Sequence, residues 1–244
     1  MRNVGIILRR ELASYFATPL AYVFILIFLV LANAFTFYLG GFYARGQADL
    51  QPFFAFHPWL YLFLIPAISM KLWAEERKSG SIELLMTLPV KVWEAVLGKY
   101  FAAWIFVALA LALTFPIWIT VNYLGNPDNG TIIAAYLGSL LLAGGFLAVG
   151  SCMSALTRNQ VVAFILGVAV CFVFLLAGYP IVLNAFQSWA PQALVGAIGS
   201  LSFLTHFQSI AKGVLEARDL LYFAMLIGFF LFTTAVALDL RKAD

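Results

Sequence analysis

The feature that most constrains this chain is a series of apolar stretches, each roughly 20 residues long, that have no charged residue in their interiors. Of the 244 residues, 64% are hydrophobic and 10% are charged, whereas soluble domains contain about 25% charged residues. We therefore predict an all-α polytopic membrane protein with a single transmembrane domain over residues 1–244. Its six predicted spans are residues 20–40, 53–73, 98–121, 132–156, 160–183 and 220–239.

Two of these spans carry features that influence their shape. The second contains Pro58 and Pro66, and we expect it to be kinked or broken near its outer end because proline removes a backbone hydrogen bond. The fourth has small residues at every fourth position, a spacing that allows close helix packing. These residues are Ala135, Ser139 and Ala143, followed by Gly144, Ala148 and Cys152.

Residues 1–18 form a predicted helix that lies in the membrane surface. Its apolar residues recur at helical spacing, and its arginines fall on other faces, where they can meet anionic headgroups. The residue before a proline avoids the helical region, so this helix should end before Pro19. The apolar residues are Val4, Ile7, Leu8, Leu12, Tyr15 and Phe16.

Lysine and arginine give the orientation. If the N-terminus is cytoplasmic, 11 of the 14 fall on the inner side, and the outer side receives only Arg45, Lys212 and Arg218. The positive-inside rule favours this topology, with both termini in the cytoplasm. Residues 184–219 are then an outer segment, too short and too polar to span, which we expect to form short re-entrant helices protected by the bundle.

The chemistry of the side chains disfavours an enzyme. The only two histidines, His57 and His206, are predicted on the outer side, where we interpret both as interfacial anchors. Cys152 and Cys171 lie in apolar runs and are interpreted as buried thiols, so no catalytic residue and no metal site is expected. The sequence also has no GxxxxGK[ST] motif for ATP. No nucleic-acid partner is expected.

Residues 74–97, "AEERKSGSIELLMTLPVKVWEAVL", hold a concentration of charge that is unusual for this chain. Glu75 and Glu76 begin it, Gly80 permits a turn, and a short amphipathic helix should follow and end at Pro89. In the predicted topology this region is cytoplasmic. Two interpretations stay open: a helix that docks into a groove of a partner, or a solvated loop on the inner leaflet.

This region resembles the permease subunits of ABC-2 type transporters. The shared pattern is an acidic residue, Gly-Ser, Glu-Leu-Leu, a proline, and Gly-Lys at the start of the third span. "RRELASYFATPLAYV" (9–23), "PFFAFHPWLYLFLIPAISMKLWAEE" (52–76) and "LSFLTHFQSIAKGVLEARDLLYF" (201–223) are also similar to the family, and residues 52–76 most resemble its gliding-motility-associated branch. The pattern here consists of Glu76, Gly80, Ser81, Glu83, Leu84, Leu85, Pro89, Gly98 and Lys99.

The resemblance implies a bacterial inner-membrane permease that works with two ATP-binding subunits and a second permease, identical or related. ATP and Mg would be bound by the partner, with no cofactor in this chain. Membrane lipid surrounds it, and the gliding branch adds an optional auxiliary protein with a periplasmic domain. By resemblance, the contacts with the ATPase come from Glu75, Glu76, Gly80, Ser81, Glu83, Leu84, Leu85, Pro89 and Lys99, and the outer gate from His206, Phe207 and Gly213.

The function implied by the resemblance is export of an unidentified substrate, with ATP hydrolysis in the partner coupled to movement of the spans. The alternative is an ATPase-driven membrane scaffold that transports nothing and acts on envelope or motility machinery. The apolar span interiors fit lipid-linked, glycan, peptide and drug-like substrates alike, so the sequence does not identify the cargo.

Overall fold

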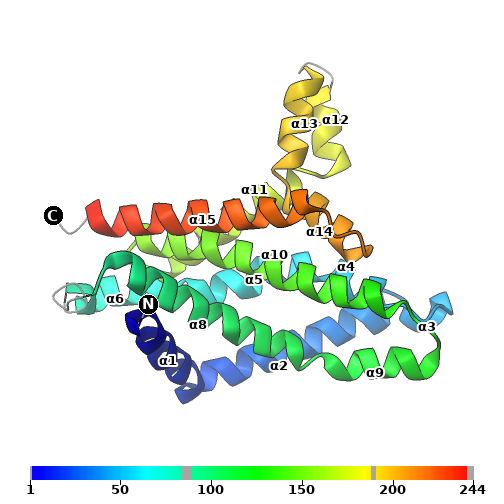
Figure 1. Cartoon of the computed structure of the whole chain (residues 1–244), viewed down its shortest axis with the longest axis horizontal. Coiled ribbons are helices and arrows are strands. Elements are labelled where there is room, and N and C mark those ends of the chain that lie inside the picture. The colour runs from blue at the N-terminus through cyan, green and yellow to red at the C-terminus, as the bar shows by residue number, and fades with distance from the viewer. Residues whose placement is uncertain (1, 84–89, 188–190, 241–244) are drawn as a thin grey trace.

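The computed structural model describes residues 2–83, 90–187 and 191–240, and every regular element within these ranges is a helix, as predicted. Most helices run along one long axis (Figure 1). The chain begins with α1 (Arg2–Ala17), α2 (Pro19–Ala34), the π-helical turn η1 (Phe35–Leu39), α3 (Phe42–Arg45), α4 (Gln51–Ala55), α5 (His57–Ser69) and α6 (Lys71–Ser79).

After residues 84–89, the chain continues with α8 (Val92–Ala112), α9 (Phe115–Leu124), α10 (Asn129–Leu156), α11 (Gln160–Leu176), α12 (Pro180–Gln187), α13 (Gln192–Ser200), α14 (Phe203–Ala211) and α15 (Ala217–Leu240). Figure 1 shows the start of α1, helix α6 and the end of α15 at one end of the bundle, which we call the α6 end. The opposite end, which holds α3 and the connection from α9 to α10, we call the α3 end.

The centre of the bundle is α10, which packs against α5, α6, α8, α11, α14 and α15. The helix begins where the Asp128 side chain accepts hydrogen bonds from the backbone N–H groups of Gly130 and Thr131, an N-cap that satisfies otherwise unpaired donors. Its small residues are buried as predicted, and they let neighbours approach closely: the Tyr100 hydroxyl reaches the Gly144 carbonyl at 3.1 Å.

Four helical stretches are long and apolar enough to cross a membrane: Pro19–Arg45, Val92–Leu124, Asn129–Leu156 and Ala217–Leu240. They contain the predicted spans 20–40, 98–121, 132–156 and 220–239. Two further pairs of helices reach that length only together, α11 with α12 and α13 with α14, and they bend by 69° and 65° at their breaks. The described residues therefore give four to six spans, and the fifth predicted span, 160–183, is straight only as far as Leu176.

The predicted second span, 53–73, needs a correction, because the structure divides it among α4, α5 and α6. The first break is at Phe56, just before Pro58, and this confirms the expected break near one end. A second break at Met70, four residues after Pro66, was not predicted. None of the three pieces is long enough to cross a membrane alone.

The second break is stabilised by one side chain from α10. The Ser154 hydroxyl accepts hydrogen bonds from the backbone N–H groups of Trp73 (3.1 Å) and Ala74 (3.0 Å), and it donates one to the Met70 carbonyl (2.8 Å). Nearby, the Trp73 indole donates to the Ser151 hydroxyl at 3.1 Å. Backbone groups that an interrupted helix leaves unpaired are thus satisfied by α10, which fixes the direction of α6.

The described part of residues 184–219 comprises the second half of α12, then α13, α14 and the start of α15. The α12–α13 hairpin projects away from the bundle, across its long axis (Figure 1). None of the described α12 side chains is buried, and in α13 only Val195 is. In contrast, α14 packs into the bundle against α4, α10, α11, α13 and α15.

Candidate functional site

The candidate site is the junction of α1, α6 and α8 at the α6 end, which surrounds the predicted coupling region. Helix α6 carries the charged cluster and ends at Gly80, whose φ of 73° lies in the left-handed region that favours glycine. Residues 81–83 are helical again, and the Glu83 N–H donates to the Gly80 carbonyl at 3.1 Å. Leu84, Leu85 and Pro89 lie outside the described residues.

Lys99 is the buried centre of this junction. Its side chain is 4% exposed, and its ammonium group lies 2.7 Å from a carboxylate oxygen of Glu76 and 3.4 Å from one of Glu11. The ammonium also lies 5.3 Å from the centre of the Trp73 ring, within range of a cation–π contact. One cation therefore joins α8, α6 and α1.

The charges of the cluster balance. Arg10 donates to the Glu11 carboxylate at 2.7 Å, so two cations face the two carboxylates of Glu11 and Glu76. Burial alone would raise the pKa of Glu11, but Lys99 and Arg10 outweigh it and lower that pKa below its ordinary value of 4.5. The Glu76 Oε2 atom is buried and has no hydrogen-bond partner in the part of the chain described, so its compensation comes from Lys99.

Helix α1 is seated on α8 by shape as well as charge. A Cβ added at Gly98 would lie 2.7 Å from the Ile7 Cγ2 atom, so only glycine lets Ile7 approach this closely. The Asn3 amide donates to the Glu94 carboxylate at 3.0 Å, and the same oxygen accepts from the Lys91 N–H at 3.2 Å. The apolar face of α1 packs against α8 and the core: Ile7 is buried and Leu12, Tyr15 and Phe16 are partly buried.

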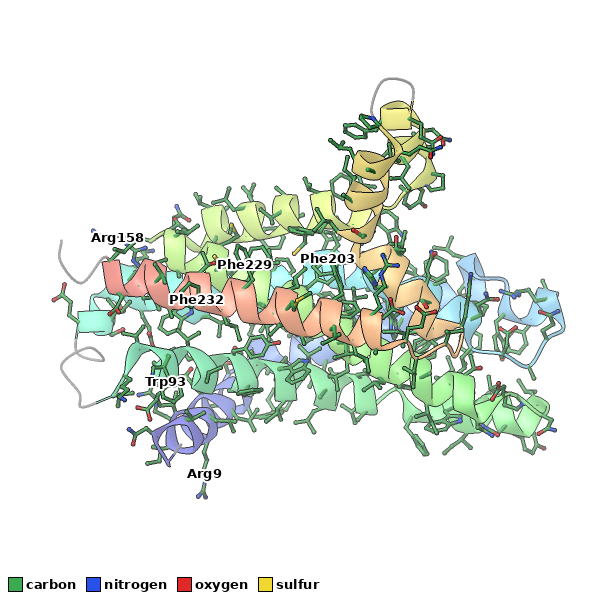
Figure 2. The ribbon with its side chains drawn as sticks, turned by 45° about the horizontal axis from the view of Figure 1, so that its top comes forward. Arg9, Trp93, Arg158, Phe203, Phe229 and Phe232 are labelled. Atoms are coloured by element: carbon green, nitrogen blue, oxygen red, sulfur yellow. The ribbon has the colours of Figure 1, made fainter. Side chains whose placement is uncertain are left out.

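The predicted coupling residues therefore divide into two groups. Glu76 and Lys99 are turned into the protein and hold the junction together. Glu75 and Glu83 are exposed, and Ser81 is partly exposed with its hydroxyl 2.9 Å from that of Ser79. Figure 2 shows other accessible side chains at this end: Arg9 from α1, Trp93 from α8 and Arg158 from the turn between α10 and α11.

The predicted outer-gate residues lie on α14 and in the turn after it. His206 is buried, with Nδ1 2.6 Å from an Asp219 carboxylate oxygen and Nε2 2.9 Å from the Ser200 carbonyl oxygen. Phe207 belongs to the core, and Gly213 lies in the turn, close to the Thr131 side chain. His206 is therefore not an interfacial anchor, because a carboxylate and a carbonyl satisfy both of its nitrogens inside the protein.

His57 also needs correction, since it was expected at the membrane interface and is fully buried. Its Nδ1 lies 2.8 Å from the Ser139 hydroxyl, which is in turn 2.7 Å from the Tyr61 hydroxyl. The rings of Phe28, Phe53 and Phe54 surround it. We assign it a packing role between α5 and α10.

A groove with a volume of about 270 Å³ lies at the α3 end. Its apolar residues include Phe54, Ile132 and Ala135, and its polar ones include Asp49, Asp128 and Lys212. Asp128 already caps α10, and Asp49 accepts from the Gln51 N–H and pairs with Arg45. Among the described residues, no group of three or more His, Cys, Asp or Glu side chains could hold a metal ion.

Sequence reasoning missed Glu11, Asp219 and Ser154 as structural partners. Glu11 follows two arginines, Arg9 and Arg10, in the predicted surface helix. Asp219 lies just before the predicted last span, at the position where charge normally ends a hydrophobic run. Ser154 is one of several small residues on α10. In each case the signal is a distant partner that the sequence alone does not reveal.

The arrangement of several long apolar helices around α10 is that of a multi-pass membrane protein. Residues 20–207 match the family described as "ABC-2 family transporter protein". Because this match covers most of the 244 residues, the chain belongs to the ABC-2 family of transporter proteins. A search of curated proteins finds no match. Members of this family are membrane components that are not themselves catalytic, and they normally work with an ATP-binding subunit and a second permease.

Proposed function

We propose that this chain is the permease subunit of an ABC transporter in the bacterial inner membrane. In this proposal it pairs with a second permease and two ATP-binding subunits, which bind ATP and Mg, and the complex exports a substrate still to be identified. The membership of the ABC-2 family supports this function. The similarity of residues 52–76 to the gliding-motility-associated branch suggests that branch, and with it an auxiliary protein.

We place the α6 end in the cytoplasm. Arg9, Arg10, Lys71, Lys78 and Arg158 all belong to that end of the bundle, whereas Arg45 and Lys212 lie towards the α3 end. An excess of basic residues on one side is typical of the cytoplasmic face. Both termini are then cytoplasmic, and the α12–α13 hairpin lies towards the outer leaflet.

The observation that carries the coupling proposal is the buried ion pair of Lys99 and Glu76 at 2.7 Å. Helix α6 enters the predicted coupling region and α8 leaves it. The ion pair therefore joins the two helices that flank this region. Lys99 also holds Glu11 of α1. If an ATPase displaces this region, α6, α8 and α1 should therefore move together. Because α8 packs against α10 and α15, the movement would also reach the membrane-spanning helices.

Two exposed carboxylates, Glu75 and Glu83, provide the test. We expect the double variant Glu75→Arg and Glu83→Arg to lose the ATP-binding subunit on co-purification from native membranes, because two charges on the docking face are reversed. The matched control is Glu216→Arg, an exposed carboxylate that precedes α15. Full retention by the double variant would contradict docking at this region, and a wild-type chain that never retains an ATPase would contradict the function itself.

The transporter and the scaffold differ in their need for hydrolysis. We expect every phenotype of the complex to disappear when the ATPase binds but cannot hydrolyse ATP, since transport consumes ATP in each cycle. A complex that supports assembly of envelope machinery with such an inactive partner would identify a scaffold.

A further inference from the structure

His206 contacts a hydrogen-bond acceptor with each of its ring nitrogens. Nδ1 lies 2.6 Å from the Asp219 carboxylate and Nε2 lies 2.9 Å from the carbonyl oxygen of Ser200. A neutral imidazole has one N–H group and can donate only once, whereas the imidazolium donates from both nitrogens. The two contacts are therefore satisfied together only when His206 carries a positive charge.

The charges around His206 are few. Among the helices that pack most closely against α14, four contain no charged residue: α4, α10, α11 and α13. Helix α15 supplies Asp219, which is buried, and Tyr222, whose ring stacks on the imidazole with 4.0 Å between centres. Lys212, Glu216 and Arg218, the charged residues in the turn and at the start of α15, are all exposed. Asp219 is thus the buried carboxylate with which an imidazolium at His206 would pair.

His206 and Tyr222 contact the end of α13, where the α12–α13 hairpin joins the bundle. Ser200 is the last residue of α13 and Leu201 is its C-cap, so their carbonyl groups lack helical partners. His206 donates to the first and the Tyr222 hydroxyl donates to the second at 2.6 Å. A cation at a helix C-terminus is also favoured by the helix dipole.

The segment that leads from α11 into the α12–α13 hairpin is held by close packing against the residues that follow α13. The Ser202 hydroxyl donates to the Leu175 carbonyl at 3.3 Å, near the end of α11. A Cβ added at Gly178 would lie 2.5 Å from the Ser202 and Thr205 hydroxyl oxygens. These contacts do not depend on protonation. The contact of His206 with Ser200 differs from them, because its donor is an imidazole nitrogen that can gain or lose a proton.

We propose that His206 and Asp219 form a proton-dependent clamp that positions the α12–α13 hairpin on the bundle. With the imidazolium present, Asp219 fixes the ring and Nε2–H holds Ser200. When the proton is lost, the remaining N–H stays with the charged acceptor Asp219, because such bonds are the stronger ones. A nitrogen lone pair then faces the Ser200 carbonyl, and the end of α13 is released. This clamp goes beyond the proposed function and requires no ATPase.

The protonation state can be tested directly, because the chain has only two histidines. In ¹⁵N-histidine NMR spectra of the full chain in lipid nanodiscs, we expect His206 to show two protonated nitrogens at mildly acidic pH. His57 should show the neutral pattern under the same conditions, and His206→Gln assigns the signals. A neutral His206 throughout the acidic range would overturn the proposal.

The release of the hairpin needs a second readout. A spin label at Ile181→Cys, an exposed position on α12, should become more mobile as the pH is raised from mildly acidic to alkaline. The variants His206→Gln and Asp219→Asn should remove this pH dependence, and His57→Gln should keep it. Label mobility that is independent of pH in the wild type, or still dependent on pH in His206→Gln, would overturn the clamp.

Discussion

Lys99 of α8 and Glu76 of α6 form an ion pair with 2.7 Å between nitrogen and oxygen, and the lysine side chain is 4% exposed. Removing one partner of a buried pair leaves the other charge without compensation. Here the Glu76 carboxylate would be left in that condition, and Glu11 would lose one of its two cations and keep Arg10.

We therefore expect Lys99→Met to lower the free energy of unfolding by about 3 kcal/mol. The measurement is reversible unfolding in detergent micelles. Lys78→Met removes an exposed lysine from the same region and should change stability little. If both variants lost the same free energy of unfolding, the loss would come from the change in net charge and not from the buried junction.

The lowered pKa of Glu11 gives a prediction for acid. Because the folded pKa lies below the ordinary value of 4.5, the ionised carboxylate contributes stability that is fully present above that value and is lost as the pH falls below it. The stability advantage of the wild type over Glu11→Gln should therefore shrink as the pH falls through this window. Glu83→Gln, a change at an exposed carboxylate, serves as the control; a constant advantage over Glu11→Gln would contradict the role of Glu11.

Gly80 ends α6 with a φ of 73°. An alanine there is strained, so Gly80→Ala should lower the free energy of unfolding by about 1 kcal/mol. The control is Gly228→Ala within α15, where an added Cβ meets nothing within 4 Å and the better helix former should stabilise. Thermal unfolding of both variants checks the difference, and a stabilised Gly80→Ala would show that the turn is not required.

The contact of Ile7 with Gly98 can be tested by exchanging volume. Gly98→Ala places a Cβ 2.7 Å from Ile7, and overpacking of this kind costs about 1–3 kcal/mol. Combining it with Ile7→Ala removes the contact with the Ile7 Cγ2 atom and leaves the one with the Ile7 Cβ atom at 2.8 Å. The clash is relieved in part, so the double variant should be more stable than the sum of the two single effects predicts. Unfolding of the four proteins in a double-mutant cycle gives the coupling energy. A coupling of zero would mean that α1 is not seated on α8.

Much of the helical layout follows from the sequence, because hydrophobic length and turn chemistry are local properties. Thr18-Pro19 ends α1, Asp128 and Asn159 cap their helices, and Pro58 marks a break. The break at Met70 and the bend after Leu176 could not be predicted in this way. Both depend on partners elsewhere in the chain, such as Ser154 for the first.

The candidate site shows the same division. Charge density and the resemblance to ABC-2 permeases pointed to the region around Gly80, and the residue at φ 73° is indeed that glycine. Which of its charges face inward was not predictable, because Lys99 is buried only when Glu11 and Glu76 converge on it from two other helices. The burial of His206 likewise depends on Asp219 and could not be read from either position alone.

Ser154 bonds to the backbone of Met70, Trp73 and Ala74, residues that precede it by 80 positions or more. During biosynthesis the joint between α5 and α6 therefore emerges from the ribosome well before the side chain that completes it. Unpaired backbone groups are costly in lipid. This implies an order of assembly. The joint between α5 and α6 can form its hydrogen bonds only after Ser154 of α10 has been synthesised.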